Sequence, residues 1–434
     1  FAPPYAGLAT LVVNTALGPH WQEAGDLARK ALELDPDLAE AHAILGLITT
    51  LYDHDPAAGA DLLERAIDLD PSYSMSYPWL AISLNRRGRD SEARDVLYRG
   101  AEYDPLNPVL ISNLADEEEL LGNFVAAEQL LLRLFFLPEL SGPAMDILDL
   151  YHDWGRYDNE LNAWKDAFLR LGADSLGDLP YLARNYAALG MRPETDYWFG
   201  KHVANSGGNP FLMADFYFVF KHFDDSSVLR DALSGAEEQA NDADTELRAA
   251  ALGYGGLAQL QIGEIETGIE WLEESIELYR FMYQPDGERG SIDVALFDNY
   301  WWTRLVVHMF QRLAFAYQQV DRAADAEDIL NQLDELLAKV PRAVPMHFEW
   351  YALQDGLRGE PDAAFASLSA AVELGWANYH EVVNDPAWAA IIEDSRIADL
   401  LDDARQRVEE QRRKVEEIER SEDFKSEFER LIAQ

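Results

Sequence analysis

Apolar residues gather in helix-length stretches along this chain, and a short polar phrase that recurs at a fixed interval closes them. Proline disfavours α geometry in the residue before it, so the phrase predicts helix ends at or near Asp35, Asp70 and Asp104. A period near 34 that closes on Asp-Pro is typical of stacked helix pairs. The phrase reads Ala31-Leu-Glu-Leu-Asp-Pro36, Ala66-Ile-Asp-Leu-Asp-Pro71 and Ala101-Glu-Tyr-Asp-Pro105, with the prolines 35 and 34 residues apart.

Glycines mark the middle of each period. A glycine that follows an apolar helical stretch suits the left-handed turn between two antiparallel helices. Small residues upstream indicate where the two helices of one repeat cross closely. The glycines are Gly88, Gly122, Gly155, Gly190, Gly263 and Gly359, and the small residues are Gly46, Ala81, Ala115, Ala183, Gly256, Ala314 and Ala352.

These positions together resemble the tetratricopeptide repeat. Residues 74–107 match its consensus best, at Leu80, Ala81, Leu84, Gly88, Ala93, Leu97 and Pro105. The resemblance implies an all-α fold, a right-handed α-α superhelix of about ten helix pairs with a C-terminal helical tail. Circular dichroism of such a fold would show no substantial sheet.

One superhelix is expected over residues 1–400, because each repeat of a solenoid contacts only its neighbours. A charged C-terminal helix is expected over 401–434. The repeats are placed near 5–38, 39–73, 74–107, 108–140, 141–175, 176–209, 210–248 (degenerate), 249–282, 307–344 and 345–378, followed by a capping helix at 385–400.

The formal net charge of -44 argues against nucleic acid and anionic membranes as default partners, since both require basic patches. Lysine supplies seven of the 35 basic residues, a balance that favours adaptation to salt. The competing hypothesis is a groove built for cationic ligands. The chain has no cysteine, which excludes disulfides and thiolate metal sites.

Both ends of the chain resemble a narrower group, the C-terminal repeat region of bacterial multidomain regulators. Those regulators carry an N-terminal winged-helix, TolB-like or adenylate-cyclase module. The resemblance implies a sensory or binding arm whose effector domain is absent here. It places the protein in the cytoplasm or periplasm, with the periplasmic side of a membrane somewhat favoured. The matching segments are Ala31–Gly46, Glu373-Leu-Gly-Trp376, Asn384-Asp-Pro-Ala-Trp388 and Asp394–Leu401.

No motif predicts catalysis. The chain lacks His-Glu-x-x-His, a phosphate loop and Gly-x-Ser-x-Gly, and carboxylate pairs are too common for any one to be singled out. Gly253-Tyr-Gly255-Gly256 is interpreted as close helix packing rather than a nucleotide loop. We therefore expect no enzyme activity, no cofactor and no metal.

The tetratricopeptide resemblance places the partner-binding groove on the first helices of the repeats, with an acidic patch from Asp116 to Asp153 that favours a basic protein or peptide. The paired lysine and asparagine that clamp a peptide carboxylate in some members are missing. The groove residues are Asn85, Arg86, Asp116, Glu119, Asp149, His152, Asp153, Arg184, His308, Gln311, Phe315 and Gln318.

The favoured function is a non-catalytic interaction scaffold, the binding arm of a bacterial regulator. The alternative is a domain that senses a small molecule near the aromatic insertion 283–302, where the repeat spacing lengthens. The tail over 401–434 is expected either to cap the last repeat or to mediate a homodimer. The dimer would join the locally basic segment Arg405–Lys414 of one chain to the acidic body of another.

Overall fold

The computed structural model describes helices throughout, and none of the described residues forms a strand. The all-α helical-repeat fold expected from the sequence is thus confirmed. The chain divides into two compact units, residues 1–146 (unit 1) and 147–434 (unit 2). The structure describes residues 3–15, 21–135, 142–171, 179–205, 216–217, 219–223, 227–233, 245–283, 300–338, 343–421 and 424–432.

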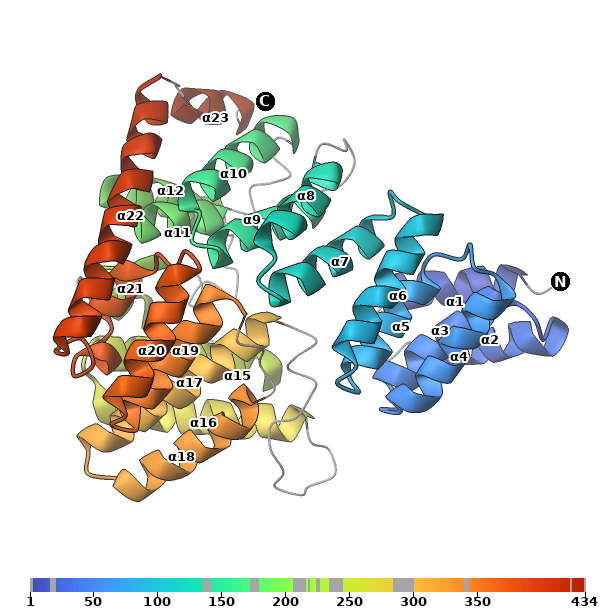
Figure 1. Ribbon diagram of the computed structural model, residues 1–434, viewed down its shortest axis with the longest axis horizontal. Coiled ribbons are helices and arrows are strands. Elements are labelled where there is room, and N and C mark those ends of the chain that lie inside the picture. The colour runs from blue at the N-terminus through green and yellow to red at the C-terminus, as the bar shows by residue number, and fades with distance from the viewer. Residues whose placement is uncertain are drawn as a thin grey trace. The chain divides into compact units, whose positions relative to one another are not determined.

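Unit 1 stacks four helix pairs (Figure 1). Its first helices contact one another in the order α1, α3, α5 and α7, whereas each second helix contacts the first helix of its own pair and of the next pair. The layer of first helices therefore forms the inner face of this unit. The pairs are α1 (Pro3–Thr15) with α2 (Trp21–Leu34), α3 (Ala39–Leu51) with α4 (Pro56–Leu69), α5 (Ser76–Asn85) with α6 (Asp90–Tyr103), and α7 (Pro108–Leu120) with α8 (Phe124–Phe135).

The Asp-Pro phrase ends helices as expected: α2, α4 and α6 stop one residue before Asp35, Asp70 and Asp104. Of the helices that follow, α3 and α5 begin after Leu38 and Met75 without a side-chain cap, whereas a polar side chain starts α7. The Asn107 carboxamide oxygen accepts from the Leu110 amide at 3.2 Å, ahead of Pro108 at the first helical position. These local signals fix where α2, α4 and α6 end and where α7 begins.

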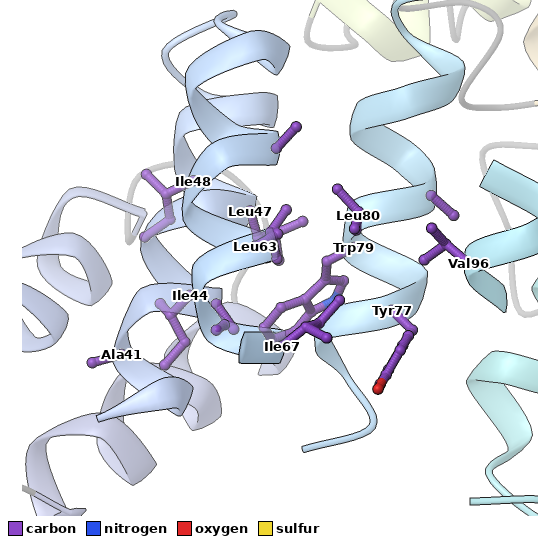
Figure 2. Packing of buried hydrophobic residues seen from close by; sticks show 14 of the residues in the cluster. Ala41, Ile44, Leu47, Ile48, Leu63, Ile67, Tyr77, Trp79, Leu80 and Val96 are labelled. Carbon is purple, nitrogen blue, oxygen red and sulfur yellow. The ribbon is translucent and has the colours of Figure 1, made fainter. Parts of the chain in front are cut away.

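The core of unit 1 lies between its helix pairs (Figure 2). Ile44 and Leu47 of α3 and Leu63 of α4 are at most 4% exposed, and Trp79 of α5 is 5% exposed. Gly46 lies where a Cβ would come within 2.6 Å of Leu63, so a small residue is required at this crossing. The expected small residues, from Ala81 to Ala352, are likewise buried at helix crossings.

Unit 2 begins within α9 and repeats the same construction (Figure 1). Between α12 and α15, the described parts of the degenerate repeat are helical at 216–217, 219–220 and 227–233. Residues 284–299, most of the aromatic insertion, lie outside the described residues. The pairs are α9 (Gly142–Asp153) with α10 (Tyr157–Leu171), α11 (Leu179–Ala188) with α12 (Arg192–Asn205), α15 (Thr245–Gln261) with α16 (Ile265–Tyr283), α17 (Tyr300–Gln319) with α18 (Ala323–Leu337), and α19 (Pro345–Leu357) with α20 (Pro361–Glu373).

The C-terminal part of unit 2 returns to the start of that unit. It comprises α21 (Tyr379–Asn384), the 3-10 helix η2 (Pro386–Trp388), α22 (Ser395–Ser421) and α23 (Phe424–Ile432). This arrangement differs from the one predicted from the sequence, which was a capping helix over 385–400 followed by a single tail helix over 401–434. Pro386 opens a short 3-10 turn, and the long helix starts only at Ser395.

Helix α22 contacts α20, α21 and α10 (Figure 1). The Gln411 side chain donates to the Gly155 carbonyl at 2.8 Å, and its oxygen accepts from the Asp158 amide at 3.2 Å. Tyr186 donates to the Glu419 carboxylate at 2.6 Å. Unit 2 is thereby closed upon itself, with its last helices covering the turns and outer surfaces of its first pairs.

The apolar strip of the tail is buried inside unit 2. Val408 and Val415 are at most 1% exposed. Phe428 stacks on Phe168 with 4.8 Å between ring centroids and meets Trp198 edge to face at the same distance. Within the described residues, this apolar strip is therefore covered by the chain's own α10 and α12, whereas the homodimer through the basic segment Arg405–Lys414 stays a prediction.

All six marked glycines adopt positive φ, from +66° to +86°, as the turn prediction required. Gly155 has a second constraint, because a Cβ there would lie 2.9 Å from the Gly375 carbonyl oxygen in the turn after α20. Gly359, in the same unit, has a φ of +76° and open space around it.

We expect Gly155→Ala to destabilise unit 2 more than Gly359→Ala does. The left-handed conformation costs either alanine about 1–2 kcal/mol. Only the Gly155 variant must also push the closing turn away. Thermal unfolding of both variants measures the difference, and equal losses would show that the two turns do not pack tightly.

Candidate functional site

The inner face of unit 1 carries four of the expected groove residues. Asn85 donates to Glu117 at 2.6 Å, and Arg86 donates to the Thr50 carbonyl at 3.2 Å. Asp116 is exposed on α7 and Glu119 is half-buried one turn later. Burial raises the pKa of Glu117, although its hydrogen bond from Asn85 acts in the opposite direction. Residues from neighbouring first helices thus meet on one accessible face, which carries Asp116 and Glu119 together with Arg86.

Apolar side chains accompany these charges. Val109, at the start of α7, is 41% exposed and Leu106, just before it, is 58% exposed. The sequence analysis did not predict either residue as part of the binding face. An apolar residue at an inner-face position of a first helix, such as Val109, could have indicated it. Unit 1 holds most of the large apolar side chains that are exposed in the described residues, at Tyr5, Leu8, Leu34, Tyr52, Tyr98, Tyr103, Leu106, Val109, Leu121 and Val125, against Leu169 and Val203 in unit 2.

The inner face of unit 2 is filled by the chain itself. The predicted groove residues His152, Asp153, Arg184, His308 and Gln311 are all at most 9% exposed. Asp149 and Phe315 are half-buried, and Gln318 is exposed and donates to the Leu357 carbonyl. The structure brings most of this set into one polar interior rather than onto an open groove.

One end of this interior is a hydrogen-bonded polar cluster between α9, α10 and α11. Arg184 donates to Glu160 at 3.0 Å, and the other oxygen of Glu160 lies 3.1 Å from Nδ1 of His152. Burial raises the pKa of Glu160 to about 8, despite the opposing effect of Arg184. Burial and nearby cations, Arg184 first among them, keep the pKa of His152 well below its usual value, so this imidazole is neutral.

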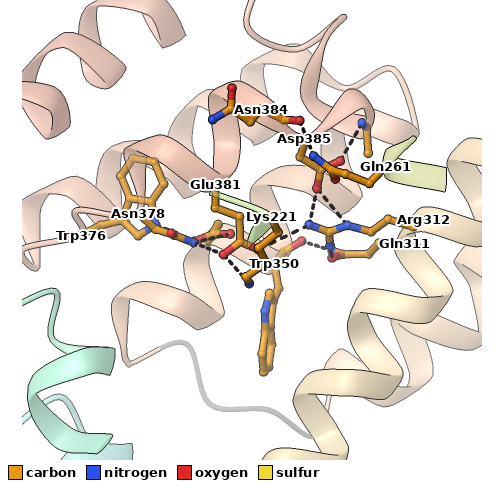
Figure 3. Close-up of polar contacts among 12 residues, drawn as sticks. Lys221, Gln261, Gln311, Arg312, Trp350, Trp376, Asn378, Glu381, Asn384 and Asp385 are labelled. Carbon is orange, nitrogen blue, oxygen red and sulfur yellow. Dashed lines mark hydrogen bonds and ion pairs between the residues drawn. The ribbon is translucent and has the colours of Figure 1, made fainter. Parts of the chain in front are cut away.

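A second cluster joins α17 to α21 and η2 (Figure 3). Arg312 contacts Asp385 through Nη2 at 2.5 Å and Nε at 3.0 Å. Lys221 lies 2.5 Å from Glu381. Asn384 donates to the His222 carbonyl at 2.8 Å, while its own carbonyl accepts from Gln261 at 2.7 Å. Residues 376–388 are thereby fixed against the inner face.

The buried charges of this interior are nearly balanced, unlike those of the whole chain. Among the described residues of unit 2, the buried carboxylates are Asp153, Asp158, Glu160, Glu349, Glu381 and Asp385. The buried basic side chains among the described residues all lie in unit 2, at Lys165, Arg184, Lys221, Arg304 and Arg312. The carboxylates that neutralise them include Glu381 and Asp385 from the C-terminal part. Burial lowers the pKa of Lys221 to about 8, while Glu381 acts to raise it. The acidic patch expected from Asp116 to Asp153 therefore does not extend into unit 2. Asp153 is buried there and lies 3.9 Å from the Arg304 guanidinium.

Sequence reasoning missed most of this network, including Glu160, Lys221, Arg304, Arg312 and Glu381. One signal was available: Arg304, His308 and Arg312 recur every four residues along α17, which puts them on one face. Their acidic partners are separated from them by up to 151 residues, as in Arg304 and Asp153, and no local pattern connects them.

A small, partly open cavity lies where the α9–α10 turn meets the α20–α21 turn. It has room for about one water molecule. Asp153 and Arg304 line it, as does Glu349, which accepts from the Trp376 indole at 2.6 Å. Its other lining residues are His152, Gly155, Tyr157, Met346, Trp376, Ala377 and Asn378.

Among the described residues, no group of three or more histidines and carboxylates is placed to hold a metal ion. The described helices also include none that is long and apolar enough to cross a membrane.

These features define a helical-repeat protein with one open and one self-filled inner face. No protein-family model and no curated protein matches the chain. Among solved structures, it is similar to Pseudomonas aeruginosa PilF, with 19% identity and a TM-score of 0.38 over 48% of this chain and 92% of that one. It is also similar to the P58(IPK) TPR domain, with 14% identity and a TM-score of 0.23 over 94% of this chain and 98% of that one. Neither similarity is close enough to indicate a function.

Proposed function

We propose that this protein is a non-catalytic scaffold for protein–protein interaction and that the inner face of unit 1 binds the partner. The observation that carries the proposal is the contrast between the two units. The inner face of unit 1 keeps Asp116 and Val109 accessible, whereas that of unit 2 is occupied by residues 376–388. A surface with exposed apolar and acidic side chains suits a partner segment that is basic and partly apolar.

The finer part of the proposal is that the scaffold is the binding arm of a bacterial regulator. The resemblance of Ala31–Gly46 and Asn384–Trp388 to such regulators supports it. The apolar strip of α22 and α23 is engaged within unit 2, so the proposal includes no homodimer through 401–434.

Peptides selected from a random displayed library against the full chain test the scaffold proposal. We expect basic peptides to be enriched, and Asp116→Asn with Glu119→Gln to slow their association several-fold at low salt. Opposite charges raise association rates by long-range attraction, which salt screens. The rates follow from surface plasmon resonance at several salt concentrations.

The matched control is Glu335→Gln, which removes one exposed charge from α18 in unit 2. It should leave association unchanged. If the unit 1 variants bind as fast as the original chain, or if no peptide is enriched, the partner-binding role of this face is wrong.

The alternative function is the sensing of a small molecule near the aromatic insertion 283–302. The cavity described above supports it, because α17 starts at Tyr300 and carries Arg304 into the cavity lining. The chemistry of that cavity indicates which ligand to test.

A further inference from the structure

We infer that the cavity at the closure of unit 2 binds the protonated amino group of a small primary amine. This inference deepens the sensing alternative and does not depend on partner binding by unit 1. It rests on the position, the size and the charge of the cavity.

The cavity is built from segments that only the closed unit brings together. Asp153 ends α9, Tyr157 starts α10, Arg304 lies on α17 and Glu349 on α19. Residues 376–378 complete the wall from the turn before α21. A ligand held here contacts the first and the last repeats of unit 2 at once, so its binding stabilises the closed form.

The charges of the lining favour a cation. Asp153 and Glu349 contribute two carboxylates against the single guanidinium of Arg304. His152 adds no positive charge, since it is neutral. An ammonium group is similar in size to the water molecule that the cavity can hold, and its N–H groups would form charge-assisted hydrogen bonds to the carboxylates.

Glu349 is the lining residue whose ionisation should change when an ammonium group binds. Burial, together with the charge of Glu381, raises its pKa to about 7. An ammonium ion attracts only the ionised carboxylate, so binding should release a proton below that pH. The titratable and charged groups around Glu349 are His152, Asp153, Tyr157, Lys221, Arg304 and Glu381.

Methylammonium chloride is the probe, used with the full chain and compared with tetramethylammonium chloride at equal ionic strength. Tetramethylammonium has the same charge but no N–H donor and is too large for the cavity. We expect methylammonium to raise the melting temperature more than tetramethylammonium does. Titration calorimetry should show tighter binding as the pH rises from 6 to 8.

Glu349→Gln tests the site itself, because glutamine keeps an oxygen that accepts from Trp376 but carries no charge. We expect it to weaken methylammonium binding at least about tenfold and to remove its pH dependence. Glu335→Gln should change neither. Circular dichroism verifies that both variants are folded.

Glycine and acetate complete the test. Binding of glycine at least as tight as that of methylammonium would support the amine site, with its carboxylate directed to Arg304. Equal stabilisation by the two ammonium salts would mean that charge screening is the whole effect and would overturn the inference. Binding of acetate in preference to methylammonium, or unchanged binding by Glu349→Gln, would also overturn it. None of these outcomes bears on peptide binding by unit 1.

Discussion

Replacing Asp385 by alanine is expected to lower the free energy of unfolding of unit 2 by about 3–5 kcal/mol. The change leaves the Arg312 guanidinium buried without the carboxylate that lies 2.5 Å away. It also removes the acceptor for the Ala387 amide at the start of η2, 2.9 Å from Oδ1. Urea denaturation followed by circular dichroism measures the loss.

Two controls separate the charge from the rest of the side chain. Asp385→Asn keeps an oxygen that accepts from the η2 amide but loses the charge. Its free energy of unfolding should therefore lie between those of the original chain and the alanine variant. Asp362→Ala breaks a pair with Arg396 in which the side chains are 92% and 42% exposed, and it should change stability little. If Asp385→Ala is as mild as Asp362→Ala, the buried pair does not hold residues 376–388 in place.

A joint replacement gives the opposite expectation. Removing both charges with Arg312→Met and Asp385→Leu avoids an unpaired buried ion, and such exchanges are often close to neutral. The double variant should therefore recover much of the stability lost in Asp385→Ala. A double variant no more stable than the single one would mean that the hydrogen bonds of Asp385, rather than its charge, fix the segment.

Deleting residues 402–434 is expected to lower the melting temperature of unit 2 strongly while leaving the oligomeric state of the protein in solution unchanged. The deletion exposes the aromatic surface of Trp164, Phe168 and Trp198 that α23 covers. It also removes Glu419, which accepts from Tyr186 and contacts Lys165. Differential scanning calorimetry and light scattering provide the two readouts.

A single substitution isolates the aromatic contribution. Phe428 is fully buried, and truncating such a ring to alanine typically costs about 3–5 kcal/mol. Phe428→Leu, which keeps most of the volume, should cost less. A fall from dimer to monomer mass on deletion would instead restore the self-association hypothesis.

The helical-repeat fold could be predicted from local signals because each acts within a few residues. The Asp-Pro phrase ends α2, α4 and α6 where expected, and the glycine turns have the positive φ that was anticipated. Gly253, Gly255 and Gly256 pack closely on neighbouring side chains, as predicted when this segment was interpreted as close helix packing. The placement of the groove on the first helices stays a prediction for unit 1.

The sequence by itself determined the helices, their pairing and the strong negative charge, since proline and glycine geometry and hydrophobic periodicity operate within one repeat. Only the tertiary structure decided that unit 2 closes upon itself. Arg312 meets Asp385 across 73 residues and Gln411 meets Gly155 across 256. Such contacts depend on the small rotation between successive repeats, which accumulates along the stack and leaves no periodic mark in the residues. That accumulated geometry converts the expected inner groove of unit 2 into a buried network of ion pairs.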